Sequence, residues 1–240
     1  MNGVIEAHGS MDLWHAVSEI TVRARTGGIA LPAKFQPSAI RQIDAVVSAG
    51  KIRVEFRNYT GEGRTGIFDE EGVCILGRDG RPLDWRKEPR DAFHAFRQRL
   101  FWDSLDALYF SGYALWNYLN LPFLLCRPDL MVKEGEPWGD DGEVWSRLIV
   151  SFPSSIPTHC RDQVFYFNRQ GLLVRHDYTA EVFGKWAKAC HYSWDHREVG
   201  GIIIPRKRRV HPRLPSNRPL RLVTLVSIGI EEIALRIRNR

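Results

Sequence analysis

The sequence predicts an α+β fold in which a curled antiparallel β-sheet, an incomplete barrel, carries a helical block on its concave side. Two groups of segments with the two-residue alternation of β-strands flank one segment with the helical period. Grouped strands interrupted by a single helical block are typical of α+β architecture. No shift in composition marks a linker, so residues 1–240 are expected to form a single domain.

Residues 1–90 are expected to hold a short helix followed by the first strand group. Ser10 is suited to capping that helix, and the segment after Glu19 is compatible with either helix or strand. Alternation after Gly50 favours a β-hairpin around residues 48–51. The other expected elements are a helix or strand over 40–47, strands over 64–68 and 73–76, the turn between them over 69–72, and a turn over 77–82.

Residues 91–125 change to the helical period and form the expected helical block. The apolar residues fall on two neighbouring stripes, Phe93, Phe96 and Leu100 on one and Trp102, Leu105 and Tyr109 on the other. Glycine weakens a helix and proline ends one, so a break or bend is expected near Gly112 and the end before Pro122.

Residues 107–125 form an uncharged run of nineteen residues, close to the length of a membrane span. Asn117, Asn120 and Pro122 interrupt its apolar character, and no second such run occurs in the chain. We therefore predict a buried helix and no transmembrane span.

Residues 143–236 are expected to form the second strand group. Strong alternation separated by turn residues predicts five or six antiparallel strands at hairpin spacing. The expected strands cover 144–152, 163–167, 172–178, 186–195, 201–210 and 220–230.

The composition is that of an ordinary globular protein, with 44% hydrophobic and 26% charged residues. The four cysteines are dispersed and form no CxxC pair, which is typical of reduced, buried thiols. The first residues contain neither a basic nor an apolar segment of the kind found in secretory signals. These observations predict a cytoplasmic location.

Positive charge is concentrated near the carboxyl terminus, where residues 206–213 form the most basic stretch. Such a stretch can attract nucleic acid, an anionic lipid surface or an acidic ligand. Alternation sends Arg206 and Arg208 to one face and Lys207 and Arg209 to the other, which favours a solvated edge strand with part of its charge facing inward. Nucleic-acid binding is not expected, because no recognition helix or stacking platform accompanies the stretch.

Two consecutive strands bring imidazole and phenol side chains together, at residues 175–178 and 191–192. Alternation places His176 and Tyr178 on one face and Asp177 on the other. In a hairpin, His191 would lie opposite either His176 or Asp177, and the sequence leaves this register open. His176, His191 and Asp177 are the candidate catalytic residues, since a histidine in an apolar site can act as a general acid or base.

We expect these polar groups to face an apolar cavity between the curled sheet and the helices, and this cavity to bind an apolar or amphipathic small molecule. The candidate ligand-binding residues are Trp102, Tyr109, Tyr113 and Trp116 as walls, with Tyr178, Tyr192 and Arg208 as orienting groups. One alternative is an enzyme, a cyclase, isomerase or hydrolase that uses a cavity histidine. Another alternative is a peripheral module that docks at an anionic surface or a protein.

No cofactor and no metal are expected. His159 and Cys160, with His176 and His191, match no zinc-ligand spacing. The glycines of residues 61–66 lead into a strand and not a helix, so they lack the context of a phosphate-binding loop. The sequence does not specify an oligomeric state.

Three motifs carry a resemblance to a known fold family. They are the aromatic run over residues 109–118, Arg175-His176-Asp177-Tyr178, and Gly200 to Pro205 followed by Arg208-Arg209-Val210. Together with the order of helical block and strands, they resemble the half-barrel proteins related to the lipoprotein carriers LolA and LolB, within an uncharacterised bacterial branch. The resemblance implies an unclosed barrel with a lid of helices and a hydrophobic ligand.

Overall fold

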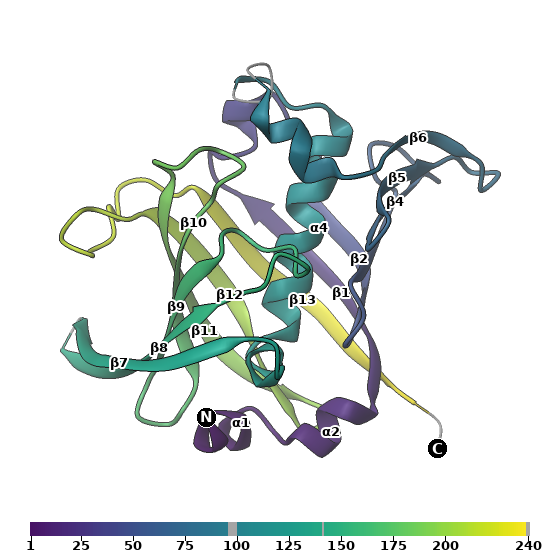
Figure 1. The fold of residues 1–240 in the computed structure, drawn as a ribbon. Coiled ribbons are helices and arrows are strands. Elements are labelled where there is room, and N and C mark those ends of the chain that lie inside the picture. Colours follow the sequence, from purple (N-terminus) through teal and green to yellow (C-terminus); the bar gives the residue numbers. More distant parts are fainter. Residues whose placement is uncertain (96–99, 141, 239–240) are drawn as a thin grey trace.

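In the computed structural model, the described residues 1–95, 100–140 and 142–238 form one 13-stranded antiparallel sheet with helices at its concave side and ends (Figure 1). The strand order is β6-β5-β4-β3-β2-β1-β13-β12-β11-β10-β9-β8-β7. Each half of this order is a simple meander of strands consecutive in the sequence. The predicted α+β fold with a curled, unclosed sheet is confirmed.

The first meander contains the elements up to residue 94. They are α1 (Asn2–Ala7), α2 (Met11–Ala16), β1 (Val17–Gly27), η1 (Pro32–Lys34), β2 (Gln42–Ser48), β3 (Arg53–Arg57), β4 (Thr65–Asp69), β5 (Gly72–Leu76), β6 (Pro82–Arg86) and η2 (Pro89–His94). Ser10 caps α2, accepting a hydrogen bond from the backbone N–H of Leu13 at 3.1 Å. The hairpin around residues 48–51 is confirmed, which excludes the helical alternative for residues 40–47. The expected turn over residues 77–82 is confirmed, whereas strand β6, which follows it from Pro82, was not predicted.

The helical block is dominated by α4 (Ser104–Asn120), which is followed by η3 (Phe123–Cys126). Asp103 and Asp106 form a reciprocal capping box at the start of α4. The expected break at Gly112 is wrong, because α4 continues through this residue without interruption. Phe93 belongs to η2, and Phe96 lies outside the described residues.

The second meander covers residues 131–237. Its strands are β7 (Met131–Asp140), β8 (Glu143–Ser151), β9 (Asp162–Phe167), β10 (Leu173–Thr179), β11 (Lys188–Val199), β12 (Ile202–Pro212) and β13 (Val226–Ile237). Strand β7 was not predicted, because Gly135 and Pro137 interrupt its alternation. Strand β13 begins later than expected, at Val226.

The two meanders join through the first and last strands of the chain. β1 pairs with β13, with Ile20 opposite Leu235, so α4 lies in the long connection that crosses between the two outer strands β6 and β7. Strand β12 is therefore an interior strand between β11 and β13. The interpretation of the basic stretch as a solvated edge strand is wrong, because β12 pairs with a neighbouring strand on each side.

The hydrophobic core forms where the sheet curls around α4 (Figure 1). Every residue of α4 after Ser104 is buried, including the polar side chains of Asn117 and Asn120. Both amides donate hydrogen bonds to backbone carbonyls, Asn117 to Pro157 at 2.9 Å and Asn120 to Trp116 at 2.9 Å. The buried-helix prediction is confirmed, and none of the helices in the described residues is long and apolar enough to cross a membrane.

Candidate functional site

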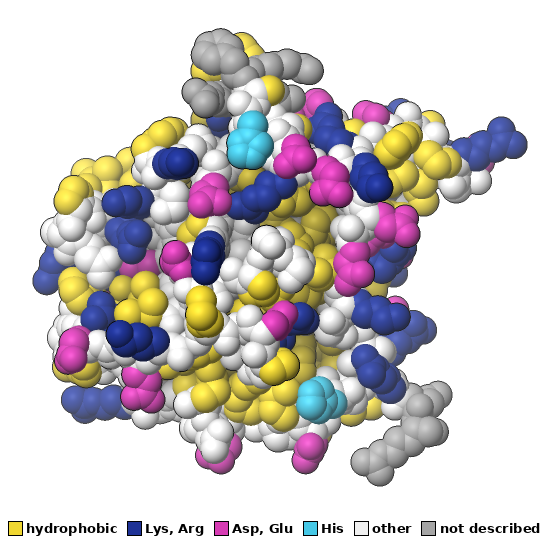
Figure 2. Space-filling model, in the orientation of Figure 1, with side chains coloured by type: hydrophobic (Ala, Val, Ile, Leu, Met, Phe, Trp, Pro, Cys, Tyr) yellow, Lys and Arg dark blue, Asp and Glu magenta, His cyan; other side chains and the backbone are white. Residues whose placement is uncertain are grey.

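A groove of about 830 Å³ lies beside α4, between the β4–β5 turn, η2 and the 152–161 connection that joins β8 to β9. Apolar side chains line its deeper part: Ile52, Phe68, Tyr109, Phe152 and Ile156. Figure 2 shows hydrophobic side chains at the base of a furrow on this face, with acidic side chains along its upper and right edges. A hollow of this size with an apolar base suits a small organic molecule.

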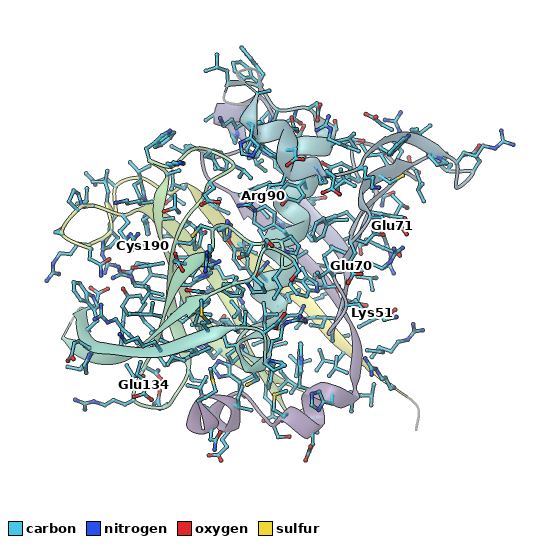
Figure 3. The ribbon with its side chains drawn as sticks, viewed as in Figure 1. Lys51, Glu70, Glu71, Arg90, Glu134 and Cys190 are labelled. Atoms are coloured by element: carbon cyan, nitrogen blue, oxygen red, sulfur yellow. The ribbon has the colours of Figure 1, made fainter. Side chains whose placement is uncertain are left out.

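The rim of the groove is predominantly acidic. Six carboxylates line it, those of Asp69, Glu70, Glu88, Asp91, Asp129 and Glu181, against the guanidinium groups of Arg90 and Arg161. Figure 3 shows Glu70 at the β4–β5 turn and Arg90 across from it, next to α4. The groove is therefore locally negative, although the whole chain has a formal net charge of +6.

Arg90 ties three parts of the groove wall together. Its Nη1 donates to the carbonyl of Thr158 at 2.7 Å, and its Nη2 pairs with Glu181 at 2.6 Å. The hydroxyl of Tyr109 on α4 is also within its hydrogen-bonding reach. Arg90 thus holds η2, α4 and the 152–161 connection in place around the groove.

A second, smaller hollow of about 230 Å³ lies at the far end of α4. Trp116 and Asn120 line it together with residues of α2 and η3 such as Trp14 and Phe123. The indole N–H of Trp116 donates to the carbonyl of Lys51 at 2.6 Å, which fixes the ring.

The two strand histidines meet under α4. His176 of β10 and His191 of β11 are directly opposite in the ladder, with ring centroids 6.0 Å apart. This register excludes the alternative that Asp177 faces His191, because Asp177 lies opposite Cys190. His176 donates from Nε2 to Gln163 Oε1 at 2.5 Å, whereas its Nδ1 has no hydrogen-bond partner in the described part of the chain.

His159 connects α4 to this cluster. Its Nε2 lies 2.8 Å from the hydroxyl of Tyr118, and its Nδ1 lies 3.2 Å from the hydroxyl of Tyr113. The His159 ring also stacks on Tyr178 at a centroid distance of 3.7 Å, and the Tyr118 and Tyr178 hydroxyls are 3.1 Å apart. We call His159, His176, His191, Tyr118, Tyr178 and Arg208 the interior polar cluster.

Burial sets the protonation of the interior polar cluster. It lowers the pKa of His159 to about 3 and the pKa values of His176 and His191 well below the ordinary 6.5. All three imidazoles are therefore neutral at neutral pH. Burial also lowers the pKa of Arg208, to about 10, so its guanidinium stays charged.

The opposite face of the same strands carries a separate buried ion pair. Arg175 donates from Nε and Nη2 to the two carboxylate oxygens of Asp177, at 2.7 and 2.8 Å. Asp140 lies near the same guanidinium, 3.3 Å from Nη1, and accepts a hydrogen bond from Tyr192 at 2.6 Å. Asp177 and Tyr192 thus face away from the histidines with which they were grouped in the sequence.

The structure distributes the predicted site residues over five places. Tyr109 lines the groove, and Trp116 lines the smaller hollow. The interior polar cluster contains His176, His191, Tyr178 and Arg208, and Tyr113 contacts it through His159. Trp102 packs among Phe93, Phe110 and Phe183, whereas Asp177 and Tyr192 occupy the opposite face of the strands. Sequence reasoning did not single out Tyr118, Gln163 or the acidic rim. Tyr118 lies within the quoted aromatic run, but only the tertiary structure turns its hydroxyl toward His159. No group of three metal-ligating side chains occurs in the part of the chain that the structure describes.

The unclosed sheet wrapped around one central helix defines a LolA-like half-barrel. The fold is similar to that of a LolA superfamily protein from Nitrosomonas europaea, with a TM-score of 0.52, 9% identity, and coverage of 99% of this chain and 94% of that one. It is also similar to a DUF1329 family protein from Desulfovibrio piger, with a TM-score of 0.52, 10% identity, and coverage of 100% and 92%. The predicted resemblance to LolA-like proteins is confirmed for the fold. No protein-family model and no curated protein matches the sequence.

Proposed function

We propose that this protein binds an apolar or amphipathic small molecule in the groove beside α4. The observation that carries the proposal is the apolar base of a hollow of about 830 Å³ in a half-barrel fold. Ile52, Phe68 and Phe152 supply this base from three different parts of the sheet and its connections. An apolar chain or ring placed there would be removed from water, at about 25 cal/mol for each Å² of apolar surface buried.

The charge of the rim limits which polar head groups such a molecule can carry. Asp69, Asp129 and Glu181 are paired with arginines, whereas Glu70 and Glu88 form no ion pair among the described residues. The negative potential that results disfavours an anionic head group and favours a neutral or positively charged one. The groove is therefore proposed to take an amphipath of that kind.

A fluorescent apolar probe, phenylnaphthylamine, tests the groove directly. Ile52 lines the groove and is half-buried, so the Ile52→Glu variant would place a charge where the probe is expected to pack. We expect its affinity for the probe to fall at least about tenfold, a loss of about 1.4 kcal/mol. Circular dichroism and thermal unfolding of the variant show whether the fold is retained.

Leu222→Glu is the matched control, because Leu222 is 95% exposed and lies outside the groove. This variant makes the same change from an aliphatic side chain to a carboxylate and is expected to bind the probe like the wild type. If a folded Ile52→Glu variant bound the probe with the affinity of the wild type, the groove would be excluded as the binding site. Mass spectrometry of the natively purified protein would then identify any molecule carried elsewhere.

A further inference from the structure

Arg208 is a buried cation that pairs with no carboxylate of the described residues. Its side chain projects from β12 into the interior, and the residue is 3% exposed. It donates from Nη1 to the hydroxyl of Ser193 at 3.2 Å and from Nη2 to the backbone carbonyl of Tyr118 at 2.8 Å. These partners are neutral. Burial of a charge is costly without an opposite charge nearby, so the arrangement lacks an anion.

His191 adds a second unsatisfied group next to Arg208. Ser193 is opposite Arg208 in the β11–β12 ladder, and His191 lies two residues before Ser193 on the same face. The His191 ring contacts the Tyr118 ring at a centroid distance of 4.4 Å, and the Arg208 guanidinium lies 5.3 Å from the centroid of that same ring. Both nitrogens of His191 are buried and have no hydrogen-bond partner among residues 1–95, 100–140 and 142–238.

Arg208 and His191 both offer hydrogen-bond donors to a ligand. A neutral imidazole carries one N–H that requires an acceptor, and a guanidinium offers five N–H groups in a planar fork. The neighbouring cluster residues His176, His159 and Tyr178 bring no negative charge at neutral pH. The site thus presents a guanidinium whose acceptors are the neutral oxygens of Ser193 and Tyr118, and an imidazole N–H without an acceptor among the described residues.

We propose that Arg208 and His191 form an interior binding site for a carboxylate group. A carboxylate would supply the missing negative charge and the missing acceptors together, and its two oxygens match the planar fork of arginine. This site is distinct from the groove, whose rim carries six carboxylates and only two guanidinium groups. Two sources supply such a carboxylate, a free small anion and the head group of a longer molecule, and the test separates them.

Thermal unfolding in four different solutes tests the proposal. The three salts are used at equal ionic strength, and the alcohol is used at the same concentration as the salts. The solutes are sodium chloride, sodium acetate, sodium decanoate and decanol. We expect the melting temperature of the wild type to rise by about 2–4 °C in a carboxylate relative to chloride. A rise in acetate assigns the site to a free small carboxylate, whereas a rise in decanoate alone assigns it to a head group. No rise in either carboxylate, or an equal rise in decanol and decanoate, would overturn the proposal.

Arg208→Met distinguishes a ligand site from a structural arginine. Because the variant removes an unpaired buried charge, we expect its melting temperature in chloride to equal or exceed that of the wild type, with the carboxylate response lost. Arg209→Met is the matched control: Arg209 is the next residue, is exposed, and packs over Trp194, so the carboxylate response is expected to remain. A carboxylate response that survives in Arg208→Met overturns the proposal.

His191→Phe provides a second variant if Arg208→Met fails to fold. The phenyl ring replaces an imidazole of similar size whose nitrogens form no hydrogen bond with any described residue, so the packing against Tyr118 is retained. We expect this variant to fold and its carboxylate response to fall by at least half. An unchanged response would remove His191 from the site. Failure of the groove experiment would leave these results unaffected, because the Ile52→Glu variant changes a different region.

Discussion

Gly112 of α4 lies directly against Phe68 of β4. A Cβ atom added to Gly112 would be 2.5 Å from Cβ and Cγ of Phe68, which is closer than non-bonded carbon atoms approach. The glycine therefore allows the helix to seat on the sheet at the base of the groove, where Phe68 is one of the lining residues. The residue that favoured a helix break in the sequence acts in the structure as a point of close helix–sheet approach.

Gly112→Ala is expected to destabilise the protein by about 1–3 kcal/mol through overpacking. In a helix interior without tertiary contacts, the same change stabilises by about 1 kcal/mol. Gly3→Ala in α1 is the control, because a Cβ atom there meets no heavy atom of the described structure within 4 Å. Urea unfolding measures both variants, and a stabilised Gly112→Ala would contradict the close contact.

Asp177→Asn is expected to lower the free energy of unfolding by about 3–5 kcal/mol, because it leaves the buried Arg175 with a weakened partner. Both side chains of this pair are 0% exposed. In the exposed pair of Arg23 and Glu232, the Glu232→Gln change should cost less than about 1 kcal/mol. Urea unfolding measures both variants. If both lost the same unfolding free energy, the buried Arg175–Asp177 pair would contribute no more to stability than the exposed pair.

Tyr192→Phe separates stability from ligand binding. The variant removes a hydroxyl that donates to the carboxylate of Asp140 at 2.6 Å, a bond to a charged group worth about 1.5–3 kcal/mol. Because Tyr192 does not line the groove, the affinity for phenylnaphthylamine is expected to stay unchanged in folded protein. A weakened probe affinity with unchanged unfolding energy would instead place Tyr192 in the binding site.

The pH dependence of stability follows from the buried histidines. Burial lowers the pKa of His8 to about 4 and that of His159 to about 3, and lowers those of His176 and His191 well below 6.5. Below pH 6.5 the unfolded chain binds protons that the folded protein excludes, so stability is present above pH 6.5 and is lost as the pH falls toward about 4. Each histidine contributes up to about 1.4 kcal/mol per pH unit.

Urea unfolding of His191→Phe between pH 7 and pH 4.5 checks this contribution. The variant lacks one of these groups, so its stability is expected to fall less steeply with acid than that of the wild type, by up to about 1.4 kcal/mol per pH unit. Parallel curves for the variant and the wild type would show that folding leaves the pKa of His191 unchanged, which contradicts the lowered pKa.

Alternation in the sequence was sufficient to predict most of the strands and the two faces of β10. It placed His176 and Tyr178 on one face and Asp177 on the other, as the structure does. It failed for β7, where glycine and proline disrupt the pattern, and at Gly112, where the consequence of a missing side chain depends on Phe68 in a strand far away in the sequence.

The candidate site was predicted only in part, because local patterns carry no information on distant pairing. The order of residues could indicate that His176 and His191 belong to adjacent strands, but not which residues lie opposite each other. The acidic groove is built from the β4–β5 turn, η2 and the 152–161 connection, and their meeting around Tyr109 follows from the curl of the sheet.

Apolar periodicity alone predicted the α+β fold with two strand groups around a buried helix, because periodicity is a local property of the chain. Three further features are visible only in the folded molecule. β1 and β13 join the two groups, α4 fills the centre of the half-barrel and leaves a groove beside it, and Arg208 is buried without a carboxylate partner among the described residues. These features depend on contacts between residues far apart in the chain, which the curl of the open sheet around the helix brings together.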